Sequence, residues 1–310
     1  MAYQFLTANS FLGLGLEATR GTAAATPTFI PITSPQVTPM QVFLRDEALR
    51  GSPVSLYDSV AGVRHDEYDV KGYVYADSFP ILVRAILGGA DTVTGAGPYL
   101  HTMKLLNDST IGSQPPSVTI QDFDGATTFQ MTGAQMSDLN FTFGAEAAAE
   151  WTAKFMGNPY TQIAKPSASF GTEGFAPGWD VTATIAGSSV AYVVDGDINI
   201  TRNTGPIFTA GTQAPRSNFA GPIDVSGRLL CVVENPTASS NVSDIFSNAT
   251  NGYALFDSPQ SLVIKLTDPV SSHYTQFTIT KAQFKDVKRN RGKSYVEVEV
   301  NFEANSNITD

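Results

Sequence analysis

The chain has 310 residues, of which 42% are hydrophobic and 15% charged, so it is long enough for two hydrophobic cores and its composition argues against disorder. Its net charge of −10 disfavours a function that depends on binding nucleic-acid phosphates. The single cysteine, Cys231, lies in an apolar run and excludes a disulfide scaffold within one chain.

No segment resembles a secretory signal or a membrane helix. The N-terminus lacks a basic region followed by an apolar stretch, and no window approaches the roughly 20 apolar residues of a membrane helix. We therefore expect a protein that is made and kept in a cytoplasm and has no membrane part.

Residues 1–28 are predicted to form an extended N-terminal arm that a neighbouring subunit orders, because Gly21–Pro27 is small and turn-prone. The arm contains Gly13-Leu-Gly-Leu-Glu-Ala18, which fits the letters of a dinucleotide-binding fingerprint. That fingerprint requires a strand leading into a helix within a βαβ unit, whereas Thr, Ala and Pro follow here. We therefore predict no nucleotide cofactor.

One short helix is predicted in the first half of the chain. Asp77 and Ser78 supply the N-cap, Pro80 lies in the opening turn, Ile81–Leu87 form an apolar body, and Gly88 ends the helix. The corresponding helix in the second half is predicted at about residues 239–248, in a segment richer in Ser and Asn.

An internal repeat dominates the rest of the sequence. Phe129–Leu139 reappears without a gap as Phe277–Val287, a shift of 148 positions (277 − 129 = 148). Three shorter matches preserve the same order, namely Asp69–Val74 with Asp224–Leu229, Ser117–Ile120 with Ser261–Ile264, and Glu150–Asn158 with Glu297–Asn305. The chain therefore reads as two copies of one module, residues 29–158 and 178–310, joined by a proline-containing linker over residues 159–177.

The repeated segments alternate apolar and polar residues, which predicts strands with one buried face. In the last strand Val298, Val300 and Phe302 share one face, and the acidic residues Glu297, Glu299 and Glu303 share the other. The fold class is thus mainly β, with two tandem β-sandwich modules that each carry one short helix.

The sequence contains no recognisable set of catalytic or metal-binding residues. The three histidines are isolated, no nucleophile elbow occurs, and the carboxylate pairs lie on exposed strand faces or in turns. We predict that the protein is not an enzyme and binds no cofactor or metal.

The one cluster of basic charge is the run between Lys281 and Lys293, which is predicted to be a loop between two strands. Its basic residues are Lys281, Lys285, Lys288, Arg289, Arg291 and Lys293. It could be a solvated loop, a contact with an acidic surface of the next subunit, or a nucleic-acid site. We favour the subunit contact, because an acidic protein that self-associates gains from complementary patches. Arg20 in the arm is a further contact candidate.

Three N-terminal segments, Gly13–Thr26, Phe29–Thr33 and Leu44–Gly51, resemble the tail tube proteins of siphophages, especially those of actinobacterial phages. The resemblance is best over residues 1–90 and covers the rest in general layout. It implies a structural protein whose rings stack into a hollow tube, in which each tail-tube module gives strands to a continuous ring-shaped β-barrel with a helix packed outside.

The resemblance also implies a number of chains in each ring. The family commonly has one module in each chain and six chains in a ring, whereas this chain carries two modules. We therefore expect a trimeric ring with pseudo-sixfold symmetry. In the alternative, six chains close the barrel through their first modules and the second modules decorate the outside.

The same resemblance implies lumen residues and partners. The lumen candidates are Glu150, Thr152, Glu297, Glu299 and Glu303, whose acidic or small polar side chains would let DNA slide without binding. The expected partners are further copies of the chain in helically stacked rings, the tape measure protein, the tail terminator or distal tail proteins, and double-stranded DNA in transient passage. The expected location is the virion tail, after assembly in the cytoplasm of the host bacterium.

Two alternatives remain at this point. One is a carbohydrate-binding β-sandwich, with a hydrolase behind it, although the exposed aromatic residues and converging carboxylates that these functions need are not evident. The other is a different structural protein of the phage tail or baseplate.

Overall fold

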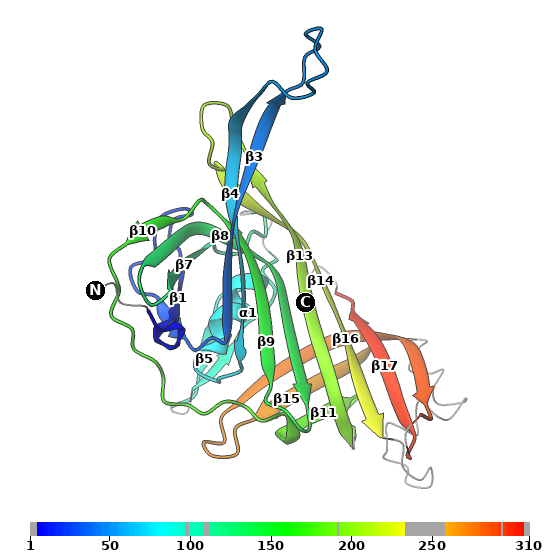
Figure 1. Ribbon diagram of the computed structural model, residues 1–310. Helices are drawn as coiled ribbons and strands as arrows, with labels where there is room; N and C mark the ends of the chain where they lie inside the picture. The colour runs from blue at the N-terminus through cyan, green and yellow to red at the C-terminus, as the bar shows by residue number, and fades with distance from the viewer. Residues whose placement is uncertain are drawn as a thin grey trace.

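The computed structural model describes residues 5–96, 99–107, 112–190, 192–232, 258–292 and 294–306, and these are mainly β with one α-helix (Figure 1). The predicted mainly β class is confirmed. No described helix is long and apolar enough to cross a membrane.

Long antiparallel strands from both halves of the chain form one continuous sheet. The first half contributes β3 (Ser34–Asp46), β4 (Asp58–Tyr73), β9 (Glu150–Gly157) and β8 (Thr128–Gly144), in that order across the sheet. The second half contributes β13 (Val193–Ile207), β14 (Ser217–Val232), β17 (Glu297–Ala304) and β16 (Tyr274–Asn290). Because β8 pairs with β13, the two series join edge to edge.

A second set of strands turns away from each series. In the first half, β2 (Thr28–Ile30), β1 (Phe11–Leu16) and β7 (Val118–Phe123) continue from the N-terminal part of β8. In the second half, β12 (Ser188–Val190), β11 (Val181–Ile185) and β15 (Gln260–Thr267) continue from β16 in the same way. The remaining elements are β5 (Thr92–Thr94) paired with β6 (Leu100–Thr102), β10 (Thr161–Ile163), which pairs with β8, and the short 3₁₀ helices η1 (Thr7–Asn9) and η3 (Gly178–Asp180).

The two halves share irregularities as well as strand order. In the β8–β9 ladder the register shifts between Met136 and Asp138, and in the β16–β17 ladder it shifts between Phe284 and Asp286. These two bulges lie at the same place in the sequence repeat. Similar bulges interrupt β7–β8 and β15–β16, and also β3–β4 and β13–β14. A bulge bends and twists a strand locally, so both halves curve at the same points.

The strand pairings correct two of the shorter sequence matches. Ala153 of β9 faces Val70 of β4, and Val300 of β17 faces Leu229 of β14, so Val70 corresponds to Leu229 and not to Val225. In β7 and β15 the structural correspondence is likewise offset, by two residues, from the sequence match. Strand register follows which residues reach the core, and short identities on the exposed face do not constrain it.

The helix α1 (Phe79–Leu87) forms where the sequence predicted it. Ser78 precedes it without a side-chain cap hydrogen bond, and Gly88 ends it with φ 82°, a left-handed conformation that glycine adopts without strain. Phe79, Leu82 and Ile86 are buried against the sheet. The helix predicted at about residues 239–248 lies outside the described residues.

Buried residues of both halves form one main hydrophobic core. Phe141 of β8 lies 5.1 Å from Phe277 of β16 and 6.2 Å from Phe79 of α1, measured between ring centroids. Trp151, Ala153 and Phe155 alternate with polar residues along β9 and turn toward this core.

Two predictions about irregular segments are wrong. The N-terminal arm contains β1, which is buried because Leu12 and Leu14 pack into the core of the same chain and pair with β7. The basic run is not a loop through most of its length, because β16 extends to Asn290 and pairs there with β17.

Candidate assembly surfaces

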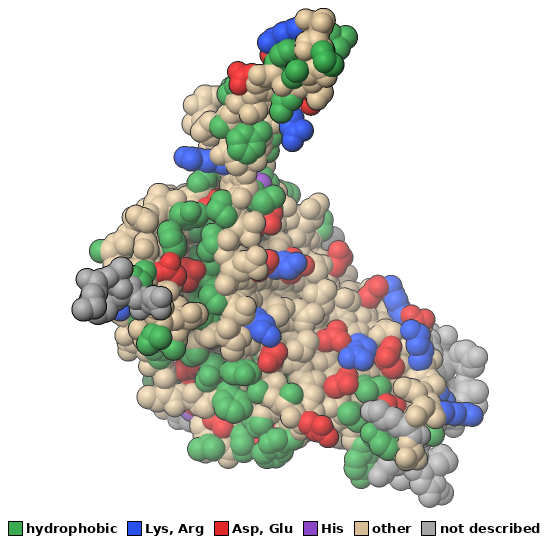
Figure 2. All heavy atoms as spheres, in the orientation of Figure 1, with side chains coloured by type: hydrophobic (Ala, Val, Ile, Leu, Met, Phe, Trp, Pro, Cys, Tyr) green, Lys and Arg blue, Asp and Glu red, His purple; other side chains and the backbone are tan. Residues whose placement is uncertain are grey.

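One face of the long sheet carries the core, and the other is open to solvent and polar. The open-face residues alternate with the core residues along each strand and include Asp69, Lys71, Asn140, Thr142, Glu150, Thr152, Lys154, Asp197, Asn199, Arg228, Glu299 and Glu303. Figure 2 shows acidic and basic side chains interspersed over this part of the molecule. The open face is therefore mixed in charge.

The charges on the open face occur as ion pairs. Arg228 of β14 lies 3.1 Å from Asp197, 2.9 Å from Asp195 and 3.7 Å from Glu299. Partial burial disfavours its charge, but the hydrogen bond to Asp197 and the three carboxylates raise the pKa of Arg228 above its ordinary value. Lys288 reaches Glu299 at 4.0 Å.

Four of the five lumen candidates lie on the open face. Glu150 pairs with Lys71 at 3.8 Å, Glu303 pairs with Lys285, and Thr152 is exposed. Glu297 does not fit this prediction, because its exposure is only 2%. It begins β17 with Val232 of β14 on one side and Asn290 of β16 on the other.

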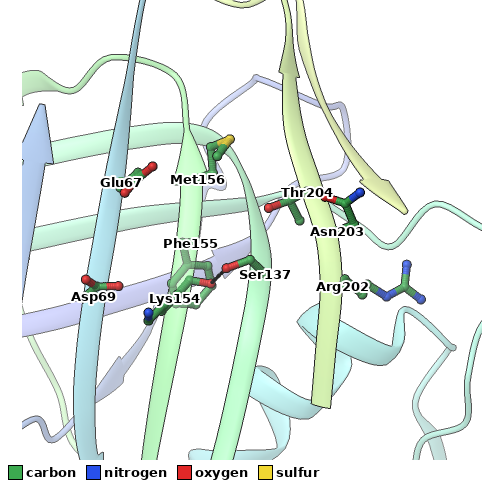
Figure 3. A pocket seen from close by; sticks show the side chains of 9 residues that line it. All are labelled: Glu67, Asp69, Ser137, Lys154, Phe155, Met156, Arg202, Asn203 and Thr204. Atoms are coloured by element: carbon green, nitrogen blue, oxygen red, sulfur yellow. Dashed lines mark hydrogen bonds between the residues drawn. The ribbon is translucent and has the colours of Figure 1, made fainter. Parts of the chain in front are cut away.

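A depression lies on the open face between β4, β9, β8 and β13 (Figure 3). It measures about 300 Å³ and is lined by Glu67, Asp69, Ser137, Lys154, Phe155, Met156, Arg202, Asn203 and Thr204. The Arg202 guanidinium points away from the other labelled side chains in Figure 3, and burial lowers its pKa. The described residues contain no metal-binding group of three or more His, Cys, Asp or Glu side chains.

The β3–β4 hairpin extends well beyond the body of the molecule (Figure 1). Its outer part exposes a series of apolar side chains, namely Met40, Val42, Phe43, Leu44, Leu49, Val54, Leu56 and Val60. At its base the β13–β14 turn supports it: Arg64 donates its amide to the Gln213 carbonyl at 2.9 Å, and Gln213 Nε2 donates to the Ala61 carbonyl at 3.1 Å.

A second exposed apolar group lies at the far end of β4 from the hairpin tip. Phe175 bridges to Tyr75 just beyond β4, and its ring lies 5.7 Å from that of Tyr73. Trp179 follows in η3 with 62% exposure, and its neighbour Gly178 donates its amide to the Ala147 carbonyl in the turn after β8. The molecule thus presents apolar surface at two opposite ends.

The subunit-contact candidates separate into two groups. Arg20 is an internal contact, since it donates to the carbonyls of Asn218 at 2.9 Å and Pro115 at 3.2 Å and so links the N-terminal segment to β14. Lys281, Lys285, Lys288 and Arg289 lie on β16, where Lys285 and Lys288 pair with β17 within the chain. Arg291 is exposed just after β16, and Lys293 lies outside the described residues.

A buried carboxylate that sequence reasoning missed organises the N-terminal segment. Glu17, 7% exposed, accepts hydrogen bonds from the Gly21 amide (2.6 Å), Ser117 Oγ (2.5 Å), Thr119 Oγ1 (2.9 Å) and the Gly133 amide (2.8 Å). The only sequence signal was an acidic residue directly after an apolar strand.

The glycines of the fingerprint-like segment have a packing role. A Cβ on Gly15 would lie 2.5 Å from the Ala24 side chain, and one on Gly13 would lie 3.1 Å from the Phe29 ring. The pattern therefore reflects close contact within the β1–β2 region.

One comparison with known proteins found a family of structural proteins. Residues 7–304 match the family model described as phage tail tube protein. A search of the curated proteins found no match.

Proposed function

The chain belongs to the phage tail tube protein family, a family of structural virion proteins, and on that premise we propose that three copies form each ring of a siphophage tail tube. In this proposal each chain supplies two equivalent modules, so the ring has pseudo-sixfold symmetry. The observation that carries it is the repeated order of strands and bulges in the two halves, which β8 and β13 already join into one sheet.

The open face of the sheet is proposed to line the tube. It is the only broad sheet face in the described part of the chain that α1 and the core leave uncovered, and it continues from β4 to β16. The proposed lumen residues on it are Glu150, Thr152, Glu299 and Glu303.

The ion pairs on this face suit a channel for DNA. A cation already paired with carboxylates, as Arg228 is, attracts a phosphate less than a free cation does. The proposed result is passage of double-stranded DNA without specific binding.

Stacking of rings is proposed to use the two apolar ends of the molecule. Contacts between different surfaces on opposite ends of one molecule repeat along an axis and generate a filament. The outer part of the β3–β4 hairpin, with Phe43 at 58% and Leu44 at 62% exposure, would meet the end of the next ring that carries Phe175 and Trp179. The tape measure protein would occupy the tube before DNA, and terminator and distal tail proteins would cap it.

Averaged end-on images of tubes isolated from virions test the number of chains in each ring. The volume of one ring in the averaged density, divided by the volume expected for one chain, gives a second measure of that number. We expect three chains and six similar lobes in each ring. Six chains in a ring would contradict the proposal and favour the arrangement in which the second half decorates the outside.

A further inference from the structure

We propose that neighbouring copies join through β16 of one copy and β3 of the next, in the register of the β8–β13 junction inside the chain. This inference rests on the proposed ring. It goes further by naming the edges, the residues that face each other, and the polarity of the hydrogen bonds.

The internal junction supplies the template. β8 and β13 pair antiparallel from Asp138 opposite Thr201 to Gly144 opposite Asp195. One residue beyond, Ala145 donates its amide to the Val194 carbonyl at 2.8 Å. In an antiparallel ladder, hydrogen-bonded pairs alternate with non-hydrogen-bonded pairs. Gly196, Ile198 and Ile200 therefore direct their backbone groups toward β8.

The bulges identify which strands are equivalent. Asp138 and Asp286 each follow the bulge in the ladder with β9 or β17, so β16 corresponds to β8. Val70 of β4 and Leu229 of β14 occupy corresponding positions in the two halves. On the opposite side of its strand, Val70 pairs with Pro35 of β3, and Leu229 pairs with Gly196 of β13. β3 therefore corresponds to β13.

Both strands offer an edge. Among the described residues, β3 pairs only with β4, and the C-terminal part of β16 pairs only with β17. Lys288, Arg289 and Asn290 are exposed on that part of β16, and Gln36 is exposed on β3. Exposed sheet edges are templates for pairing with another chain. A second copy satisfies both edges at once.

Transfer of the template gives a defined register. Ser34, Gln36, Thr38 and Met40 of one copy lie opposite Gly292, Asn290, Lys288 and Asp286 of the other, respectively. These residues correspond to open-face positions of β8 and β13, so the open face continues without interruption from one copy to the next. The charged positions of β16 meet neutral side chains of β3.

Two prolines give this junction a polarity. Pro35 and Pro39 correspond to Gly196 and Ile200, so their nitrogens face the neighbouring copy and cannot donate. Their carbonyls still accept the amides of Arg291 and Val287. Two β3 edges would form fewer hydrogen bonds with each other than β3 forms with β16, because each β3 edge lacks the amide donors at both prolines. Pairing of β3 with β3 is therefore disfavoured.

Paired cysteines test the register. Cys231 is 4% exposed and burial raises the pKa of its thiol to about 12, so the native cysteine stays unreactive. Thr38→Cys with Lys288→Cys places two thiols directly opposite each other, within disulfide reach. Thr38→Cys with Asn290→Cys is the matched control, since it keeps the same face but is displaced by two residues.

Tubes of each variant are oxidised and run on non-reducing gels. We expect covalent trimers from the first pair, at least about tenfold more linked product than from the control, and dimers when the two single variants are mixed. Tubes that form without this cross-link, or that cross-link better in the control, overturn the register and leave the proposed function intact. Failure of the unmodified protein to form rings or tubes counts against the proposed function itself.

Discussion

At the scale of single residues, the buried Glu17 carboxylate has a structural role that no local sequence pattern predicted. It accepts four hydrogen bonds from three segments far apart in sequence and holds the end of β1 against β7 and β8. Glu17→Gln would turn an acceptor oxygen into a donor that faces other donors. We expect a loss of about 2–4 kcal/mol in the free energy of unfolding, measured by urea denaturation of unassembled protein. Glu146→Gln, at an exposed turn, is the control and should change little.

Asp122 is the second residue with a measurable consequence. Burial, with a smaller contribution from the charge of Asp124, raises the pKa of Asp122 to about 6. In the unfolded chain Asp122 has the ordinary pKa of an aspartate. The ionised carboxylate therefore lowers the stability of the folded chain above about pH 6. This cost disappears as the pH falls through 6 toward 4. Asp122→Asn should therefore be more stable than the native protein by about 1–2 kcal/mol at pH 7.5 and equal to it near pH 4.

Urea unfolding at a series of pH values checks this dependence. Asp224→Asn, at an exposed position of β14, is the matched control and should show no such difference. An Asp122→Asn variant that is less stable than the native protein at pH 7.5 would show that the carboxylate makes a favourable interaction there.

At the scale of elements, substitutions in the β3–β4 hairpin can test assembly without affecting the folding of one chain. The outer part of the hairpin is exposed and apolar, so its side chains contribute little to the stability of one chain. We expect Phe43→Ser with Leu44→Ser to leave the thermal unfolding temperature nearly unchanged and to block tube growth, followed by negative-stain imaging and light scattering.

The β5–β6 hairpin offers a control of similar character. The exposures of Val93 and Leu100, 51% and 47%, are close to those of Phe43 and Leu44. Serine at both positions should leave tube growth intact. Equal loss of growth in the two double variants would show that any loss of exposed apolar side chains impairs growth, and would contradict a stacking contact at Phe43 and Leu44.

At the scale of the whole molecule, the open face tests the proposed lumen. Glu299→Lys with Glu303→Lys would surround Arg228, Lys285 and Lys288 with further positive charge and create a phosphate-binding surface. We expect tubes to assemble, DNA ejection from virions to slow by about tenfold or more, and high salt to relieve the effect. Ejection is followed by dye fluorescence, and an unchanged rate would refute the placement of this face. Glu297 is omitted because it is buried.

Patterns in the sequence determined much of the local structure. The gapless match of Phe129–Leu139 with Phe277–Val287 predicted a duplication, on which the proposed ring rests. Alternating residues predicted the strands β8, β9, β16 and β17, and the Ser78-to-Gly88 signals predicted α1. These signals are local, because strand periodicity and helix termination depend on residues close together in the chain.

Only the tertiary structure decided how these elements meet. In the tertiary structure β8 pairs with β13 and joins the two halves, and the residue of β14 that corresponds to Val70 of β4 differs from the one in the sequence match. Arg228 lies beside three carboxylates, and the N-terminal segment pairs within the sheet of its own chain. Each of these depends on contacts between distant residues, and strand register follows which side chains reach the shared core, a property that no short segment carries by itself.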